Sequence, residues 1–145
     1  MAEDGPYLKP GFLMKSLIGP LVMRSGKVPV LTVAGRKSGQ PRSVPIGAPV
    51  EVDGHRYLLS ARGQTYWIRN LRAAGCGTLR NRGVTESFRA VEVEGEERDR
   101  VIAAYRAWLG KRVEPAFVKL PDPADHPTFR LDDVAVVSAP RGKAG

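Results

Sequence analysis

The 145-residue chain has few of the side chains that build disulfides and metal centres. Cysteine occurs once, at Cys76, which excludes an internal disulfide and a cysteine-based zinc site. Only two histidines are present, His55 and His126, so the ligand supply for a catalytic metal is also poor. We therefore expect no metal site. A lone thiol is also typical of a reducing compartment, and we expect a cytoplasmic protein.

Long apolar runs are absent as well. No stretch approaches the ~20 residues that a membrane-spanning helix needs, and the first ten residues lack the layout of a signal peptide. The N-terminal segment 1–26 instead places apolar residues at helical spacing among basic ones. This pattern predicts a helical segment that packs on the body of the protein. The alternative is a basic amphipathic segment that makes weak contact with an anionic membrane surface, which would place the protein at the membrane periphery.

Acidic residues are scarce in the middle of the chain. The chain has 23 Lys+Arg against 15 Asp+Glu, a net charge of +8. Between Gly35 and Ala90 there are three acids and ten cations, so this stretch carries nearly the whole excess. The ten are Arg36, Lys37, Arg42, Arg56, Arg62, Arg69, Arg72, Arg80, Arg82 and Arg89. Such crowding is best tolerated where an anion binds, and arginine suits phosphate and carboxylate groups, so we expect an anionic ligand.

Short strands joined by turns dominate the pattern. Strands are predicted over residues 28–34, 43–52, 55–60, 78–82, 86–94 and 129–138. Asp53-Gly54 and Gly83 mark hairpin turns between them. The segment 43–52 contains Pro45 and Pro49 and is therefore predicted as an edge or irregular strand.

Two helices are predicted within this series of strands. The first covers residues 66–74, with Thr65 as its cap and Gly75 and Gly77 at its end. The second covers residues 96–112, with a buried stripe of Val101, Tyr105, Trp108 and Leu109. Residues 113–128 are a proline-rich connection and residues 139–145 a tail. The order predicts one α+β domain over residues 1–145, mainly antiparallel, best described as a small barrel with helices at its ends.

The loop from Gly35 to Arg42 has the chemistry of an anion site. Gly35 and Gly39 allow backbone amides to turn toward an anion, and Ser38 adds a hydroxyl donor. Lys37 and Arg42 can neutralise one phosphate from two sides. The alternative is a basic β-turn with a solvated face.

A second constellation follows at the predicted helix 66–74. Trp67 and Asn70 are three residues apart and point the same way near the helix start, where free N–H groups suit an anion. The alternative is that Trp67 and Leu71 are core residues and that Asn70 is exposed.

Together the two motifs resemble those of the deazaflavin-dependent nitroreductase family. The matching stretches are Leu31-Thr-Val-Ala-Gly-Arg-Lys-Ser-Gly-Gln-Pro-Arg42, followed by Pro45, and Trp67-Ile-Arg-Asn-Leu-Arg-Ala73. The resemblance implies a split β-barrel related to FMN-binding oxidoreductases. It also implies binding of coenzyme F420, a hydroxy-deazaflavin with a phosphate and an oligoglutamate tail. FMN or another flavin is the alternative cofactor.

The resemblance also implies roles for single residues. The phosphate would be held by Lys37, Ser38, Gly39 and Arg42. The deazaflavin would lie beside Val44 and Pro45, above the loop with Ser60, Arg62 and Gly63, and Trp67 and Asn70 would close the phosphate side.

The reaction implied is hydride transfer from the reduced cofactor to an electron-poor small molecule, such as a nitroaromatic, a quinone or an enone. Tyr66 is the candidate catalytic residue, a proton donor to the acceptor; the alternative is a half-buried aromatic residue at a helix start. The better-studied branch of the family walls its substrate pocket with tyrosines from the C-terminal part. In this chain, Tyr105 is the only tyrosine after Tyr66.

Two other functions compete with an F420-dependent oxidoreductase. One is a non-catalytic carrier of a cofactor or tetrapyrrole on the same barrel. The other is a basic nucleic-acid-binding barrel, which needs exposed aromatic residues among its cations. Because Tyr57 and Phe88 occupy inward strand positions, we expect no nucleic-acid partner. The expected partners are a small-molecule substrate and, as for many barrels of this kind, a second copy of the chain in a homodimer.

Overall fold

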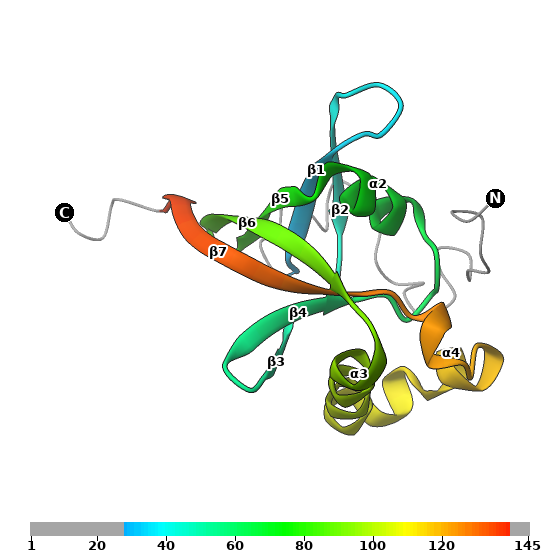
Figure 1. Ribbon diagram of the computed structural model, residues 1–145. Coiled ribbons are helices and arrows are strands. Elements are labelled where there is room, and N and C mark those ends of the chain that lie inside the picture. The colour runs from blue at the N-terminus through cyan, green and yellow to red at the C-terminus, as the bar shows by residue number, and fades with distance from the viewer. Residues whose placement is uncertain (1–27, 140–145) are drawn as a thin grey trace.

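The computed structural model describes residues 28–139, so the predictions for segment 1–26 and for the tail beyond Ala139 lie outside the described residues (Figure 1). Within this range, strands form one antiparallel sheet in the order β2-β1-β5-β6-β7-β4-β3. Their bounds are β1 (Val30–Ala34), β2 (Pro41–Pro45), β3 (Val50–Val52), β4 (His55–Leu59), β5 (Cys76–Asn81), β6 (Val84–Val93) and β7 (Thr128–Ser138).

The predicted hairpin turns are confirmed. Asp53 and Gly54 both have positive φ, 51° and 81°, and connect β3 to β4. Arg82 and Gly83, at 54° and 84°, do the same between β5 and β6. Two successive residues at positive φ match the twist of the flanking strands, which explains why Asp-Gly is a strong hairpin signal.

The predicted strand 43–52 is wrong as one element. Its first part belongs to β2, which pairs with β1, and its last part is β3, which pairs with β4 at the opposite end of the sheet order. Proline has no N–H to donate to a ladder, so Pro45 and Pro49 interrupt the strand between the two pairings. Both pieces are edge strands, as the prolines predicted.

The sheet curls around one apolar core. Leu31 of β1 and Leu58 of β4 stand near opposite ends of the sheet order, yet both belong to a single buried cluster. Phe88, Leu131 and Phe129 join that cluster from the middle strands. A flat sheet would hold its ends apart, so shared burial at both ends requires the curvature of a barrel.

Helices cover this barrel. α2 (Tyr66–Ala74) inserts Ile68 and Leu71 into the main core, and Gly75 ends it at φ 74°. α3 (Gly95–Leu109), extended by the short η2 (Gly110–Arg112), packs Val101 against β3 and β4. Both helices confirm the predictions closely. No helix within residues 28–139 has the length and apolar character needed to cross a membrane.

Three details of the helical regions differ from prediction. Residues 113–128 contain α4 (Glu114–Lys119) and η3 (Pro123–Asp125), because Ala116 and Phe117 supply a short buried face. Trp108 of α3 is 54% exposed and not part of the buried stripe. Gly77 lies inside β5, where a Cβ would stand 3.0 Å from the carbonyl oxygen of Thr32. Gly77 therefore permits close strand packing and does not end a helix.

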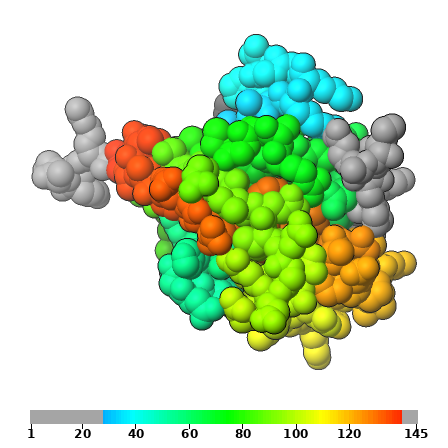
Figure 2. All heavy atoms as spheres, viewed as in Figure 1, coloured from blue at the N-terminus to red at the C-terminus, as the bar shows by residue number. Residues whose placement is uncertain are grey.

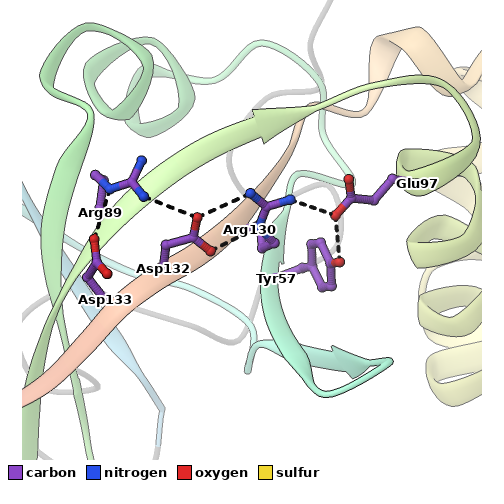
Figure 3. Close-up of polar contacts among 6 residues, drawn as sticks. All are labelled: Tyr57, Arg89, Glu97, Arg130, Asp132 and Asp133. Atoms are coloured by element: carbon purple, nitrogen blue, oxygen red, sulfur yellow. Dashed lines mark hydrogen bonds and ion pairs between the residues drawn. The ribbon is translucent and has the colours of Figure 1, made fainter.

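A chain of charged side chains joins α3 to the sheet (Figure 3). Tyr57 donates a hydrogen bond of 2.8 Å to Glu97, which also accepts one of 3.1 Å from Arg130. Arg130 donates in turn to both carboxylate oxygens of Asp132, at 2.9 and 3.2 Å. Burial and the bond to Glu97 raise the pKa of Tyr57 to about 12. Hydrogen bonds from Tyr57 and Arg130 lower the pKa of Glu97, and those from Arg130 lower the pKa of Asp132.

This network predicts a loss of stability in acid. A carboxyl group whose folded-state pKa is lowered stabilises the fold above its unfolded pKa, about 4, and stops doing so as pH falls through the folded value. We expect Glu97→Gln to reduce the free energy of unfolding by about 1 kcal/mol at pH 7, the size of a partly exposed ion pair. The difference from wild type should shrink below about pH 4 in urea titrations across pH.

Glu96→Gln is the matched control, because Glu96 lies in the same first turn but is exposed. Its effect should stay within a few tenths of a kcal/mol, the range of helix-dipole interactions. A pH-independent difference for Glu97→Gln would contradict the role assigned to the charge.

Candidate functional site

The loop between β1 and β2 and the helix α2 enclose a cleft of about 500 Å³, called here the first cleft. Figure 1 shows the loop rising beside α2, and in Figure 2 its atoms, cyan, project from the body next to the green atoms of α2. The lining residues include four cations and no acid. They are Val33, Gly35, Arg36, Lys37, Ser38, Arg42, Ser43, Val44, Arg62, Thr65, Tyr66, Trp67 and Asn70.

The loop is closed by its own backbone. The amide of Gly35 donates to the carbonyl of Gln40, and the amide of Gly39 donates to the carbonyl of Gly35, both at 2.8 Å. The turn itself uses these two amides, so the amides available to an anion are others of the loop. In the part of the chain that the structure describes, the amides of Lys37 and Ser38 have no backbone acceptor, and these remain for a ligand.

Two cations of the loop, Lys37 and Arg42, have no acidic partner among the described residues. A Cβ on Gly35 would lie 3.3 Å from both Cγ and Nε of Arg42, so the glycine lets the Arg42 side chain fold over the loop. Among residues 28–139, neither Lys37 nor Arg42 forms an ion pair. By contrast, Arg56, Arg72 and Arg89 pair with carboxylates outside the first cleft. Ion pairs thus neutralise some of the ten cations between Gly35 and Ala90, and only four of the ten line the first cleft.

Asn70 ties the loop to α2. Its Oδ1 accepts hydrogen bonds from the amide of Arg36 at 3.1 Å and from the Arg36 guanidinium at 2.9 Å. Asn70 is 8% exposed, so the alternative of an exposed amide is wrong. The Arg36–Asn70 pair therefore sets the width of the first cleft by joining its two walls.

A second cleft, of about 390 Å³, adjoins the first. Arg62 and Trp67 line both, so they form the shared wall. The far wall of the second cleft comes from α3 and includes Tyr105 and Trp108. Burial raises the pKa of Tyr105 to about 12, so its phenol stays protonated near neutral pH. The remaining lining is mainly apolar.

The structure brings together most of the predicted site residues. Those lining the first cleft are Lys37, Ser38, Arg42, Val44, Arg62, Tyr66, Trp67 and Asn70. Pro45 and Ser60 line the second cleft with Arg62 and Trp67. Gly39 and Gly63 line neither: Gly39 shapes the turn, at φ 77°, and Gly63 accepts the hydroxyl of Ser60 at 2.6 Å.

Tyr66 is not the half-buried aromatic residue of the alternative reading, because it is 67% exposed. It stands at the rim of the first cleft, with the guanidinium carbons of Arg36 and Arg69 5.9 and 5.8 Å from its ring centre. Its hydroxyl is therefore open to a bound molecule.

Three residues near the clefts have side-chain environments that the sequence did not predict. Arg36 was counted only as one of many cations, and its pairing with Asn70, 34 residues away, has no local signal. Thr65 was predicted as a helix cap, yet its side chain makes no capping bond. His126 had no assigned role, although it is buried and bonds the carbonyl of Ser60. Within residues 28–139, no three His, Cys, Asp or Glu side chains gather as metal ligands.

The curled antiparallel sheet is a split β-barrel of the FMN-binding-like fold, and solved structures with this fold resemble it. An F420-H2 dependent reductase (FDR-A) is 23% identical, with 72% of this chain and 93% of that chain covered and a TM-score of 0.54. A structure described as a domain-swapped dimer is 24% identical, covering 72% and 79%, at 0.54. HutZ, a heme storage protein from Vibrio cholerae, is 17% identical, covering 81% and 93%, at 0.55.

These identities are low, so the likeness establishes the split-barrel fold that the sequence predicted. No curated protein matches the chain. The family is established separately: residues 14–112 match the model of the F420H(2)-dependent quinone reductases, and the chain belongs to this family. Its cofactor is coenzyme F420, as the resemblance implied.

Proposed function

We propose that the protein is an F420-dependent reductase of quinones or similar electron-poor small molecules, with F420 in the first cleft and the acceptor in the second. Membership of the F420H(2)-dependent quinone reductase family supports the conclusion that the protein is an F420-dependent oxidoreductase. The observation that carries the finer assignment is the pair of adjoining clefts. Neither lining includes an acid; the first has four cations, whereas the second has only Arg62 and Arg112 among mainly apolar residues, and the two clefts share Arg62 and Trp67 as a wall.

The residues of the first cleft fit the anionic part of F420. Lys37 and Arg42 lack acidic partners within the described chain and can bind phosphate or carboxylate oxygens, with Ser38 as a hydroxyl donor. Val44 and Pro45 are adjacent in β2 and line one cleft each, so the deazaflavin ring would sit at the junction beside them. When bound, reduced F420 supplies a hydride, and the protein positions donor and acceptor.

The second cleft suits a flat apolar acceptor. Its apolar lining favours burial of a quinone or nitroaromatic ring, and the protonated phenol of Tyr105 can donate a hydrogen bond to an acceptor oxygen. Tyr66 is the proposed proton donor to the reduced acceptor; because it lines only the first cleft, this role requires the acceptor to extend past the shared wall of Arg62 and Trp67. The homodimer predicted from the sequence stays a prediction.

The test is a binding titration followed by turnover. F420 should quench tryptophan fluorescence in Trp108→Phe, which retains Trp67 on the shared wall, and reduced F420 should be oxidised when a quinone is added. Trp67→Phe, which retains only Trp108, should show the smaller change per bound cofactor. The proposal would be contradicted if the wild-type protein did not bind F420. It would also be contradicted if reduced F420 bound but was not oxidised when any of the tested quinones or nitroaromatics was added.

A further inference from the structure

Thr65 carries a buried hydroxyl group that the protein itself does not use. The residue is 4% exposed, and its Oγ1 has no hydrogen-bond partner among the described residues. It occupies the N-cap position of α2, where a threonine ordinarily accepts a bond from a first-turn amide, but its side chain makes no such bond. Buried polar groups are nearly always paired, and Thr65 is one of the residues that line the first cleft, so its unpaired hydroxyl points to a ligand.

Backbone amides next to Thr65 also lack a hydrogen-bond partner among the described residues. The carbonyl of Thr65 accepts the amide of Arg69 at 3.1 Å and starts the helix. The amides of Tyr66, Trp67 and Ile68 come before that of Arg69 in the chain. Over residues 28–139 they have no backbone acceptor, as expected in the first turn of a helix. The first turn contains no acid, so nothing on the helix competes with an anion for its positive end.

The surroundings of Thr65 also favour a negative group. Thr65, Tyr66 and Trp67 line the first cleft together with Arg62, which stands on the loop just before the helix. The amide of Thr65 donates to the carbonyl of Gly63 at 2.9 Å, so a tight turn fixes the backbone of Thr65. The site is thus built from side chain, backbone and turn, and it lies on a different wall from Lys37 and Arg42.

We propose that Thr65 and the first turn of α2 form a second oxyanion site in the first cleft, separate from the loop of Lys37 and Arg42. The Thr65 hydroxyl donates to one oxygen of the ligand, and the first-turn amides can donate to its neighbours. The cleft therefore selects a ligand with two separate anionic groups. The inference rests on the proposed function, because F420, with its phosphate and its carboxylates, is such a ligand.

The test compares Thr65→Val, which keeps the shape and removes the hydroxyl, with Thr65→Ser, which keeps the hydroxyl. By calorimetry, Thr65→Val should bind F420 about tenfold or more weakly than wild type, the loss expected for one charge-assisted hydrogen bond, whereas Thr65→Ser should stay within about threefold. Without ligand, Thr65→Val should melt at the wild-type temperature or above, because the hydroxyl bonds nothing in the protein. Equal F420 affinity of Thr65→Val and wild type, or a lower melting temperature of the ligand-free Thr65→Val, would overturn the inference.

A second arm separates this inference from the proposed function. Inorganic phosphate should raise the melting temperature of wild type and Thr65→Ser more than that of Thr65→Val. If wild type fails to bind F420 but phosphate still distinguishes the variants, the proposed function is wrong and the oxyanion site stands. If phosphate stabilises all three proteins equally, the oxyanion site is wrong.

Discussion

Replacing both Lys37 and Arg42 by alanine is expected to weaken F420 binding by at least about 2 kcal/mol, roughly thirtyfold in Kd. Both side chains line the first cleft, and neither has an acidic partner in the part of the chain that the structure describes. A charge-assisted hydrogen bond contributes about 1.5–3 kcal/mol, so losing two such groups should be measurable even if water or Arg36 compensates in part.

The titration should be repeated at low and high salt, by calorimetry and by Trp67 fluorescence. Lys111→Ala/Lys119→Ala is the matched control, because it removes the same two charges from exposed positions outside both clefts. This control should change Kd by less than about threefold at physiological salt, where long-range charge effects are screened. Equal weakening in both double variants would show a general field effect, and unchanged affinity in Lys37→Ala/Arg42→Ala would show that the loop does not hold the anion.

Removing the imidazole of His126 is expected to lower the free energy of unfolding by about 3 kcal/mol, in the range of large core truncations. His126 is fully buried, and its ring stacks on Phe117 with 4.2 Å between centroids. Its Nδ1 lies 3.0 Å from the carbonyl oxygen of Ser60, and its Nε2 lies 2.6 Å from that of Leu120. The ring therefore joins the end of β4, the segment after α4 and the start of β7.

His126→Ala would leave a cavity and remove the ring N–H that donates to one of these carbonyl groups. Urea unfolding measures the loss, with His55→Ala as the control. His55 is the only other histidine and is exposed, so its replacement should change stability by no more than about 0.5 kcal/mol. A loss below about 1 kcal/mol for His126→Ala would show that the imidazole does not hold these three segments together.

The features that the sequence predicted correctly are those that depend on interactions between residues close together in the chain. The turns at Asp53-Gly54 and Gly83, the helices over 66–74 and 96–112 and the alternating strand β6 depend on neighbours in sequence, and the structure confirms them. Trp108 was misplaced because helical spacing defines an apolar face but not how much of it a partner covers. Helix α4 was missed because it has six residues and its burial comes from contacts that Phe117 makes outside it.

Some features of the candidate site were also predicted from the sequence, whereas others became visible only in the structure. The composition of the loop from Gly35 to Arg42 predicted an anion site. The structure shows that the amides of Gly35 and Gly39 close the turn, whereas those of Lys37 and Ser38 have no backbone acceptor within the described residues. The unpaired hydroxyl of Thr65 had no signal in the sequence, since the same threonine at the same position ordinarily caps its helix.

By itself, the sequence determined the antiparallel hairpins, the excess of positive charge and the pair of motifs that identify the family, because turn preferences, charge and motif spacing are local properties of a chain. Within residues 28–139, the tertiary structure decided which cations pair with an acid, which polar groups form hydrogen bonds and how two clefts come to share Arg62 and Trp67. Those outcomes depend on contacts between residues tens of positions apart, such as Arg36 with Asn70 and Arg56 with Glu86, and only the curled sheet brings such residues together.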